Sequence, residues 1–324
     1  MKILITGAAG FIGTNLILRL SAEGHQILAM DDQDAFFSHL RAANPDRTTF
    51  CVRPFQRDTV FDDVLEGQDI VFHLANTSPP DHMHAPGTNI AEELSDSVIS
   101  TSRLLDACVR HGIRNVVFVS SGGAVYGKDA TCPIPENEPL MPVNSNGIQK
   151  ASIEHLLYLY QYLHDLHYKV VRLANPYGPY QRPNGILGAL TTFTDRILRD
   201  KEIVVYGDGS VIRDFIFIDD AVSAMINVAM NESKHSVYNI GSGEGVSIRD
   251  IIARAEAVLG RKARVSFTPS RKTDIPVNYL DVSRYEAEFG KLPSVSMDKG
   301  IALTAAFLGR YYGIPVPPLT EFLS

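Results

Sequence analysis

Three glycines lie three residues apart in the segment KILITGAAGFIG (residues 2–13), directly after a short apolar run. The first glycine permits a tight turn, the second lets the backbone approach a phosphate, and the third lets the following helix pack closely on the strand. The unpaired N–H groups and the dipole at the start of that helix favour a bound pyrophosphate. The segment therefore predicts a dinucleotide site formed by Gly7, Gly10, Phe11, Ile12 and Gly13.

A pair of carboxylates follows the next apolar run, residues 25–30, about 18 residues after the last glycine. Asp31 and Asp32 are suited there to accept both hydroxyls of an adenosine ribose and to repel a 2′-phosphate. This pattern favours NAD over NADP. Further along, we expect Asp58 to reach the adenine edge, and the backbone of Leu74 and Ala75 to lie against the cofactor.

These residues must be positioned by an alternating pattern of strands and helices. Apolar runs at residues 25–30, 49–52, 69–74, 115–120 and 169–173 predict buried strands, and helices are expected from about Phe11, at 88–110 and at 148–166. Strands that alternate with helices in this way form a right-handed, doubly wound parallel sheet of the Rossmann type. We expect a cofactor domain at 1–174, to which elements near 214–240 return, and a smaller α/β substrate lobe at 175–324.

Composition narrows the function classes. The 324 residues are 45% hydrophobic and 21% charged, with a net charge of −7, which is typical of a soluble globular protein and argues against a nucleic-acid surface. Three cysteines without a C-x-x-C pair indicate free thiols in a reducing cytoplasm. No run is long enough to span a membrane. His82 and His84 have no third ligand at usable spacing, so no metal site is predicted.

Several motifs appear in an order that resembles one enzyme family. They are TGAAGFIG (6–13), VFHLAN (71–76), SSGGAVYG (120–127), RLANPYGP (172–179), GDGSVIRDFIFIDD (207–220) and YNIGSGEGVSI (238–248). Together they resemble the extended short-chain dehydrogenases/reductases, specifically the NAD-dependent sugar-nucleotide epimerases and dehydratases. The UDP-glucose 4-epimerases are the most similar members.

The resemblance implies catalytic chemistry in which a tyrosine removes the proton of a sugar 4-hydroxyl while hydride leaves C4. A lysine four residues later, here Lys150, lowers the pKa of that tyrosine and binds the nicotinamide ribose. This chain departs from the pattern, because Asn146 stands at the tyrosine position and asparagine cannot act as a base. The assisting hydroxyl positions fall on Gly122 and Ala124, which leaves Ser121, while Ser120 is expected at the cofactor.

The residues that hold the substrate in this family are present. The resemblance assigns Asn175, Arg213 and Arg271 to the diphosphate of the sugar nucleotide, and arginine suits this role because its planar fork donates bidentately. The alternatives are a surface ion pair for Arg271 and a salt bridge of Arg213 with Asp214. Tyr126 is expected to pack near the sugar, with a substitute proton acceptor as its alternative role. Relatives dimerise through two long helices, here 88–110 and 148–166, so a homodimer is expected.

Three functions remain open. The first is a UDP-hexose 4-epimerase that passes through a 4-keto intermediate and needs a substitute base. The second is a protein, natural or an inactivated variant, that binds NAD and a nucleotide sugar without turnover, since both the phenol and its helper are absent. The third, a dehydratase, is weaker, because the Asp–Glu pair of those relatives is missing at residues 122–124.

Overall fold

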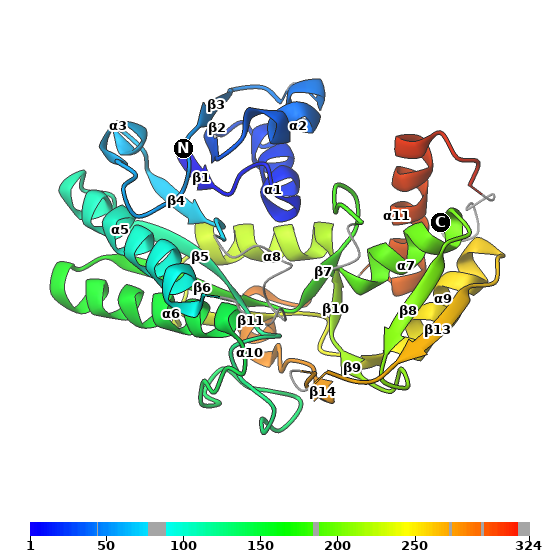
Figure 1. Ribbon diagram of the computed structural model, residues 1–324. Helices are drawn as coiled ribbons and strands as arrows, with labels where there is room; N and C mark the ends of the chain where they lie inside the picture. Colours follow the sequence, from blue (N-terminus) through cyan, green and yellow to red (C-terminus); the bar gives the residue numbers. More distant parts are fainter. Residues whose placement is uncertain (44, 77–88, 184–187, 272–273, 293–294, 317–324) are drawn as a thin grey trace. The chain divides into compact units, whose positions relative to one another are not determined.

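The computed structural model describes all residues except 44, 77–88, 184–187, 272–273, 293–294 and 317–324 (Figure 1). The chain packs as two compact units. The first unit comprises residues 1–125, 140–172 and 225–238, and the second comprises 126–139, 173–224 and 239–324. Each unit is therefore built from segments that are far apart in the sequence.

A seven-stranded sheet in the order β11-β6-β5-β4-β1-β2-β3 organises the first unit. The neighbours from β5 to β3 all run parallel, as expected of strands joined by helical crossovers. The prediction of a doubly wound parallel sheet is thus confirmed. Its strands are β1 (Lys2–Thr6), β2 (Gln26–Asp31), β3 (Thr48–Val52), β4 (Ile70–His73), β5 (Asn115–Ser121), β6 (His167–Leu173) and β11 (Val237–Ile240).

The helices that cover this sheet differ from the predictions in one region. The helix expected at 88–110 is divided: residue 88 lies outside the described residues, and a π-helical turn separates two α-helices in the rest. The polar stretch after β2, which has no clear periodicity, forms a 3₁₀ turn and a short helix. The elements are α1 (Phe11–Ala22), η1 (Asp34–Phe37), α2 (Ser38–Ala43), α3 (Asp62–Leu65), α4 (Ile90–Leu94), η3 (Ser95–Ile99), α5 (Ser100–Arg110) and α6 (Ser145–His164).

Burial of apolar side chains fixes α5 and α6 against the sheet. Leu104 of α5 and Ile153 and Leu157 of α6 join Val116 and Phe118 of β5 in one buried cluster. Burying such a side chain contributes roughly 1.5–3 kcal/mol. The result is that the inner face of α6 has a fixed register on β5.

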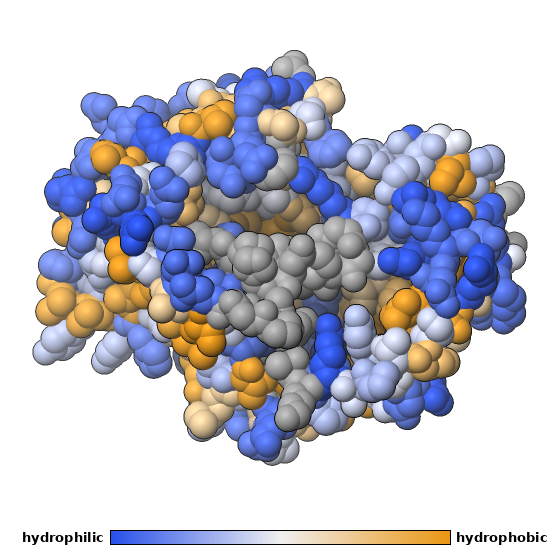
Figure 2. All heavy atoms as spheres, in the orientation of Figure 1, coloured by the Kyte–Doolittle hydropathy of each residue, from blue (hydrophilic) through white to orange (hydrophobic). Residues whose placement is uncertain are grey.

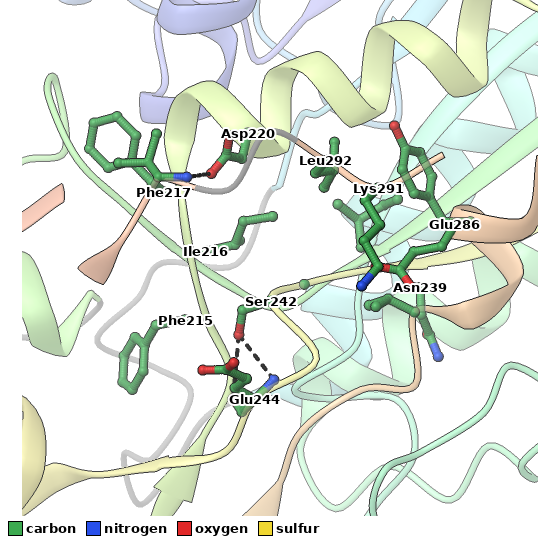
Figure 3. A pocket seen from close by; sticks show the side chains of 15 residues that line it. Phe215, Ile216, Phe217, Asp220, Asn239, Ser242, Glu244, Glu286, Lys291 and Leu292 are labelled. Atoms are coloured by element: carbon green, nitrogen blue, oxygen red, sulfur yellow. Dashed lines mark hydrogen bonds between the residues drawn. The ribbon is translucent and has the colours of Figure 1, made fainter. Parts of the chain in front are cut away.

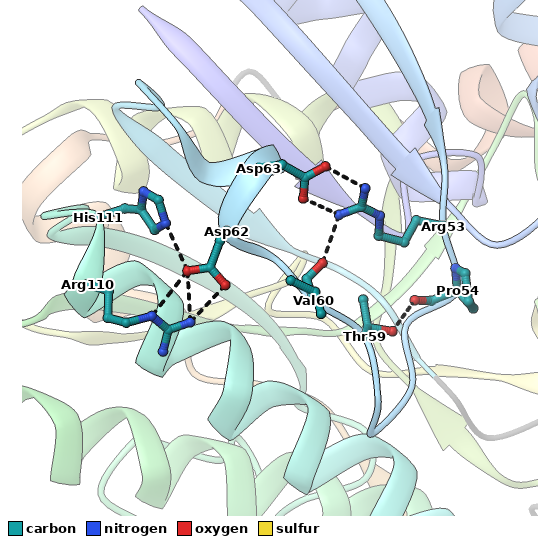
Figure 4. Close-up of polar contacts among 8 residues, drawn as sticks. All are labelled: Arg53, Pro54, Thr59, Val60, Asp62, Asp63, Arg110 and His111. Carbon is teal, nitrogen blue, oxygen red and sulfur yellow. Dashed lines mark hydrogen bonds and ion pairs between the residues drawn. The ribbon is translucent and has the colours of Figure 1, made fainter.

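An exposed ion network fastens the C-terminal end of α5 to the segment that follows β3 (Figure 4). Both Asp62 oxygens accept hydrogen bonds from Arg110, and His111 Nε2 lies 3.0 Å from Asp62 Oδ1. Arg53 pairs with the two oxygens of Asp63 at 2.5 and 2.6 Å. Exposed pairs contribute about 0–1 kcal/mol each, so this network adds to the register that the core has set.

Small sheets and packed helices make up the second unit. The strand pairs and triplet are β10-β7, β12-β9-β14 and β13-β8, and helices α7, α9 and α11 pack against one another. The bounds are β7 (Asn175–Tyr177), α7 (Ala189–Leu198), β8 (Glu202–Tyr206), β9 (Ile212–Arg213), β10 (Phe215–Phe217), α8 (Ile218–Met230), β12 (Val246–Ser247), α9 (Ile248–Leu259), β13 (Arg264–Thr268), β14 (Val277–Asn278), α10 (Ser283–Phe289) and α11 (Met297–Tyr312). Helix α8 ends in the first unit.

A buried carboxylate ties these small elements together. Asp214, between β9 and β10, accepts backbone N–H groups from Ser242, Gly243 and Leu280. Burial raises the pKa of Asp214, and these hydrogen bonds oppose that shift. Asp214 thus binds backbone amides, and the described contacts of Arg213 go elsewhere.

The face drawn in Figure 2 intersperses hydrophilic and hydrophobic side chains. Among the described residues, no helix combines the length and apolar character that crossing a membrane requires.

Candidate functional site

The glycine turn between β1 and α1 has no room for side chains. Gly7 has φ +70°, and a Cβ there would lie 2.7 Å from the Ala75 nitrogen; a Cβ on Gly13 would lie 2.6 Å from the carbonyl oxygens of Gly7 and Ala8. The N-cap, Gly10, offers no side-chain oxygen to the first turn of α1. The N–H groups at this helix end, including those of Phe11 and Ile12, therefore remain suited to an anion.

The carboxylate expected at the ribose lies beside this turn. Asp31, at the end of β2, accepts the Ala9 N–H at 2.8 Å and the Asp32 N–H at 2.9 Å. Burial raises the pKa of Asp31 to about 6, against the lowering effect of the Ala9 hydrogen bond. Asp32 and Asp58 are exposed. Asp58 lies 4.0 Å from both Arg57 and Arg103.

A hydrogen-bonded histidine supports the backbone at Leu74 and Ala75. Thr101 donates its hydroxyl to the Ser97 carbonyl at 2.8 Å, so it must accept from His73 Nε2 at 3.0 Å. His73 Nδ1 then accepts from Thr6, whose oxygen lies 3.4 Å from the Ala75 nitrogen. Burial, followed by the charge of Lys150, lowers the pKa of His73 to about 3. His73 is therefore a neutral Nε2–H tautomer.

The first turn of α6 carries Asn146, which takes the tyrosine position of the pattern. Asn144 caps this helix by accepting the Gly147 N–H, and a Cβ on Gly147 would overlap the Ala124 carbonyl oxygen. Asn146 is only 8% exposed, and its Oδ1 accepts a hydrogen bond from Asn76 at 3.3 Å. The first turn of α6 thus carries an amide pair at the position for which the sequence pattern led us to expect a phenol.

Lys150 lies one turn further along α6 and is also 8% exposed. Its Nζ donates to the Val119 carbonyl at 3.0 Å and lies 4.7 Å from the centre of the Phe118 ring. Burial lowers the pKa of Lys150 to about 8, although the charge of Glu154 opposes the shift. A lysine in this state exchanges protons near neutral pH.

A buried ion pair holds the next turn of α6. Arg172 of β6 binds both oxygens of Glu154, the shorter contact being 2.7 Å, and Ser120 of β5 donates its hydroxyl to Glu154 at 2.5 Å. This triad was not predicted, because nothing in the sequence pairs positions 120, 154 and 172. The hydrogen bond to Glu154 uses the only hydroxyl proton of Ser120.

The end of β5 and the loop after it carry the other residues expected at the reacting sugar. Ala124 is buried and Ser121 is partly exposed. Tyr126, in the second unit, is 1% exposed and donates its hydroxyl to Asn239 Oδ1 at 2.6 Å. This arrangement favours the packing role of Tyr126 over that of a substitute proton acceptor.

The three residues expected at the diphosphate all lie in the second unit. Asn175, the first residue of β7, donates its amide to the Asp214 carbonyl at 2.8 Å. Arg213 uses Nη1 for the carbonyls of Ile212 and Ile275. Within the described part of the chain, no hydrogen bond uses its Nε or Nη2. Burial lowers the pKa of Arg213, and the charge of Asp274 opposes this.

Arg271 has more partners than Arg213. It pairs with Asp274 at 3.0 Å, and its guanidinium lies 4.3 Å from the centre of the Tyr206 ring. Its side chain remains 38% exposed, so the ion pair and a bound anion are compatible. Asp274 thus lies near both arginines and fixes part of their orientation.

Comparison with known proteins identifies the family of this chain. The model of the "NAD dependent epimerase/dehydratase family" matches residues 3–241. The chain belongs to this family. It is 32% identical to a UDP-glucose 4-epimerase of Mycolicibacterium smegmatis over 95% of this chain and 98% of that protein. It is 30% identical to a dTDP-glucose 4,6-dehydratase of Streptomyces griseus, over 95% and 94%.

Solved structures of members of this epimerase/dehydratase family also resemble this chain. The UDP-glucuronic acid 4-epimerase of Bacillus cereus, in complex with UDP-glucuronic acid and NAD, is 27% identical, with a TM-score of 0.86 over 96% of this chain and all of that chain. The cofactor of the family is NAD. The glycine turn and Asp31 fit NAD, because the turn offers N–H donors without Cβ atoms and the carboxylate lies beside it.

The second unit contains a cavity of about 220 Å³ (Figure 3). Its walls come from β10, residues 239–244, α10 and the segment that follows α10. None of the predicted substrate residues lines it.

His82 and His84, the two histidines considered for a metal site, lie outside the described residues. Among the described residues, no cluster of His, Cys, Asp and Glu side chains could hold a metal ion.

Proposed function

We propose that this protein is an NAD-dependent sugar-nucleotide epimerase that acts at C4 of a UDP-hexose through a 4-keto intermediate. The observation that carries the proposal is the buried Lys150 in the same unit as the glycine turn. A series of contacts joins them: the turn at Gly7 adjoins Ala75, and the His73 ring lies 5.3 Å from that of Phe118, on which Lys150 rests. End-to-end similarity to a UDP-glucose 4-epimerase supports the choice of reaction.

The first unit holds the cofactor in this proposal. The glycine turn and the start of α1 bind the pyrophosphate, Asp31 accepts the ribose hydroxyls, and Leu74 and Ala75 provide a backbone surface. Asp32, Asp58 and Ser120 complete the contacts. When bound, NAD supplies a reversible hydride acceptor. Lys150, buried in the same unit, then acts where the substrate hydroxyl loses its proton.

The second unit holds the substrate. Arg213 offers Nε and Nη2 to a diphosphate, and Arg271 adds a second cation that Asp274 and Tyr206 orient. Asn175 and Tyr126 support this surface. A diphosphate is the ligand best matched to two arginines, since their planar forks donate in pairs.

Direct assay tests this function. The protein is incubated with NAD and with UDP-glucose, UDP-N-acetylglucosamine or UDP-glucuronic acid, and proton NMR follows the 4-epimer and any keto-sugar. We expect slow epimer formation and at least tenfold weaker substrate binding for Arg213→Met, with exposed Arg264→Met as control. Absence of epimer and keto-sugar over hours, for all three substrates, would reject the proposal.

A second function is favoured by one specific observation. The Asn146–Asn76 amide pair has no acid–base capacity near neutrality. The residues expected to bind NAD and the nucleotide sugar fit a protein that binds both ligands without turnover equally well. In that case Asn146→Tyr combined with Ala124→Thr creates activity where the unaltered chain has none. The dehydratase alternative lacks its Asp–Glu pair at residues 122–124.

We further propose that the protein forms a homodimer through α6 and the helix α5 beside it. Side chains of Ile148, Leu159, Tyr162 and Leu163 are exposed along one side of α6, and Ile99 is exposed just before α5. Apolar side chains gathered on one helix face typically mark an interface. A second copy of this chain supplies a matching face under two-fold symmetry.

A further inference from the structure

We infer that Lys150 itself is the proton acceptor for the substrate hydroxyl in this protein, through one bridging water molecule. The inference rests on the proposed function and names the group that replaces the missing tyrosine. Its basis is the hydrogen-bond state of the polar side chains that surround α6 in the first unit.

Among the residues that the structure describes, the other candidate proton acceptors already have hydrogen-bond partners or cannot titrate. Ser120 donates its proton to Glu154, and both ring nitrogens of His73 are used by Thr6 and Thr101. Tyr126 donates to Asn239. Ser121 has a hydroxyl but, within the described residues, no hydrogen-bonded base beside it, and serine without a base is not a proton acceptor near neutrality. Asn146 has no titratable group.

The surroundings of Lys150 suit reversible protonation. The Val119 carbonyl accepts one N–H whether the amine is charged or neutral, so the lone pair of the neutral amine can point elsewhere. The Phe118 ring stabilises the charged form through its π face. Burial stabilises the neutral form and sets the pKa at about 8. The two forms are therefore close in free energy at physiological pH.

Charged and titratable groups from each packed element leave this balance intact. Glu154, on the same helix, is shared with Arg172 of β6, whose guanidinium binds both its oxygens. His73 of β4 is neutral. The Glu154 carboxylate therefore offsets the arginine. Glu93 of α4, another buried carboxylate, accepts a hydrogen bond from Gln149, the residue before Lys150, at 3.4 Å.

The step balances as follows. The substrate O–H bond breaks and the proton passes through the water to the neutral amine, which becomes an ammonium ion. NAD, which the glycine turn and Asp31 would hold, would supply the acceptor for the hydride as the C4–H bond breaks, and the O–H electron pair would form the carbonyl. Return of hydride to the opposite face and of the proton from Lys150 completes epimerisation without net oxidation.

The first experiment is independent of turnover. Protein labelled with ¹⁵N at lysine Nζ is titrated by NMR, and Lys150→Met identifies the Lys150 signal. We expect that signal to titrate at about pH 8, well below the ordinary lysine value of about 10.4. A Lys150 signal that titrates with the exposed lysines overturns the inference.

The second experiment measures rate against pH. Between pH 7 and pH 9 we expect kcat to rise about tenfold in the wild type, as the neutral fraction grows from about a tenth to about nine tenths. Lys150→Arg keeps the charge but cannot lose a proton, so it should retain NAD affinity and lose activity 10²–10⁴-fold. Lys201→Met is the control that should leave both unchanged.

The outcomes separate the two proposals. Lys150→Arg with wild-type rate overturns Lys150 as the acceptor and leaves the epimerase proposal standing. Absence of activity in the wild type and in Asn146→Tyr, with NAD bound to both, rejects both proposals.

Discussion

At the scale of single residues, the cofactor region combines a close-packed turn with a buried carboxylate. Gly7, Asp31 and Ala75, three of the residues expected at NAD, lie at the ends of β1, β2 and β4, and Asp31 accepts a hydrogen bond from Ala9 of the turn. Two predictions concern these residues. One follows from the lack of room for a Cβ at Gly13, and the other follows from the raised pKa of Asp31.

Gly13→Ala should weaken NAD binding more than it weakens the fold. The new Cβ would lie 2.6 Å from two carbonyl oxygens, so the turn must shift, at a cost of about 1–3 kcal/mol. NAD affinity, measured by calorimetry, should fall at least tenfold. Gly112→Ala, at φ +69° with no atom within 4 Å of its Cβ, is the control: it should lower stability by up to about 1 kcal/mol and leave NAD affinity unchanged. Equal NAD binding by Gly13→Ala would contradict the assignment of the turn.

Asp31→Asn should make the NAD-free protein less sensitive to pH. The folded-state pKa of about 6 lies above the unfolded value, so folding takes up a proton between about pH 4 and pH 6 and stability falls as pH rises through this window. The amide still accepts from Ala9 but carries no charge. Thermal unfolding from pH 4 to pH 8 should show a smaller decline for Asp31→Asn than for the wild type or for exposed Asp129→Asn. NAD affinity should fall, and discrimination against NADP should weaken.

At the scale of elements, the buried Glu154–Arg172 pair determines how α6 lies on β5 and β6. Removing either partner leaves the other charge buried, at a cost of about 3–5 kcal/mol, whereas replacing both with apolar residues is close to neutral. We expect Glu154→Leu and Arg172→Met each to lower the free energy of unfolding in urea by that amount, and the double variant to recover most of it. The exposed pair Arg19–Glu23 is the control, with effects below about 1 kcal/mol. Additive losses in the double variant would contradict the ion-pair interpretation.

Much of the fold was predictable because local patterns determine it. The apolar runs place β2, β4 and β5 within one residue of their observed ends. The π-helical turn at Ser95–Ile99 was not predictable, since apolar residues at helical spacing cannot distinguish an inserted residue from a straight helix. The hydrogen bond of Asn76 with Asn146 joins residues 70 positions apart, and no local pattern records it. The protonation state of Lys150 was not predictable either, because it depends on burial by residues from distant parts of the sequence.

At the scale of the whole molecule, the two units divide the predicted roles. Residues expected to bind NAD, together with Asn146 and Lys150, lie in the first unit, and those expected to bind the diphosphate lie in the second. Each unit draws on at least three segments of the chain. The units therefore cannot be separated by a single cut, and functional tests require the full chain.

Dimer formation depends on the exposed face of α6, and Tyr162→Glu should prevent it. Tyr162 is 78% exposed, with Leu159 and Leu163 beside it on the helix, so in a dimer a carboxylate there would lose water without gaining a partner. We expect the wild type to elute with the mass of two chains in light scattering, and Tyr162→Glu with the mass of one, its circular dichroism unchanged. Val60→Glu, at a position 64% exposed in the loop before α3, is the matched control and should remain dimeric. A monomeric wild type, or a dimer that survives Tyr162→Glu combined with Leu159→Glu, would show that this face does not join the two copies.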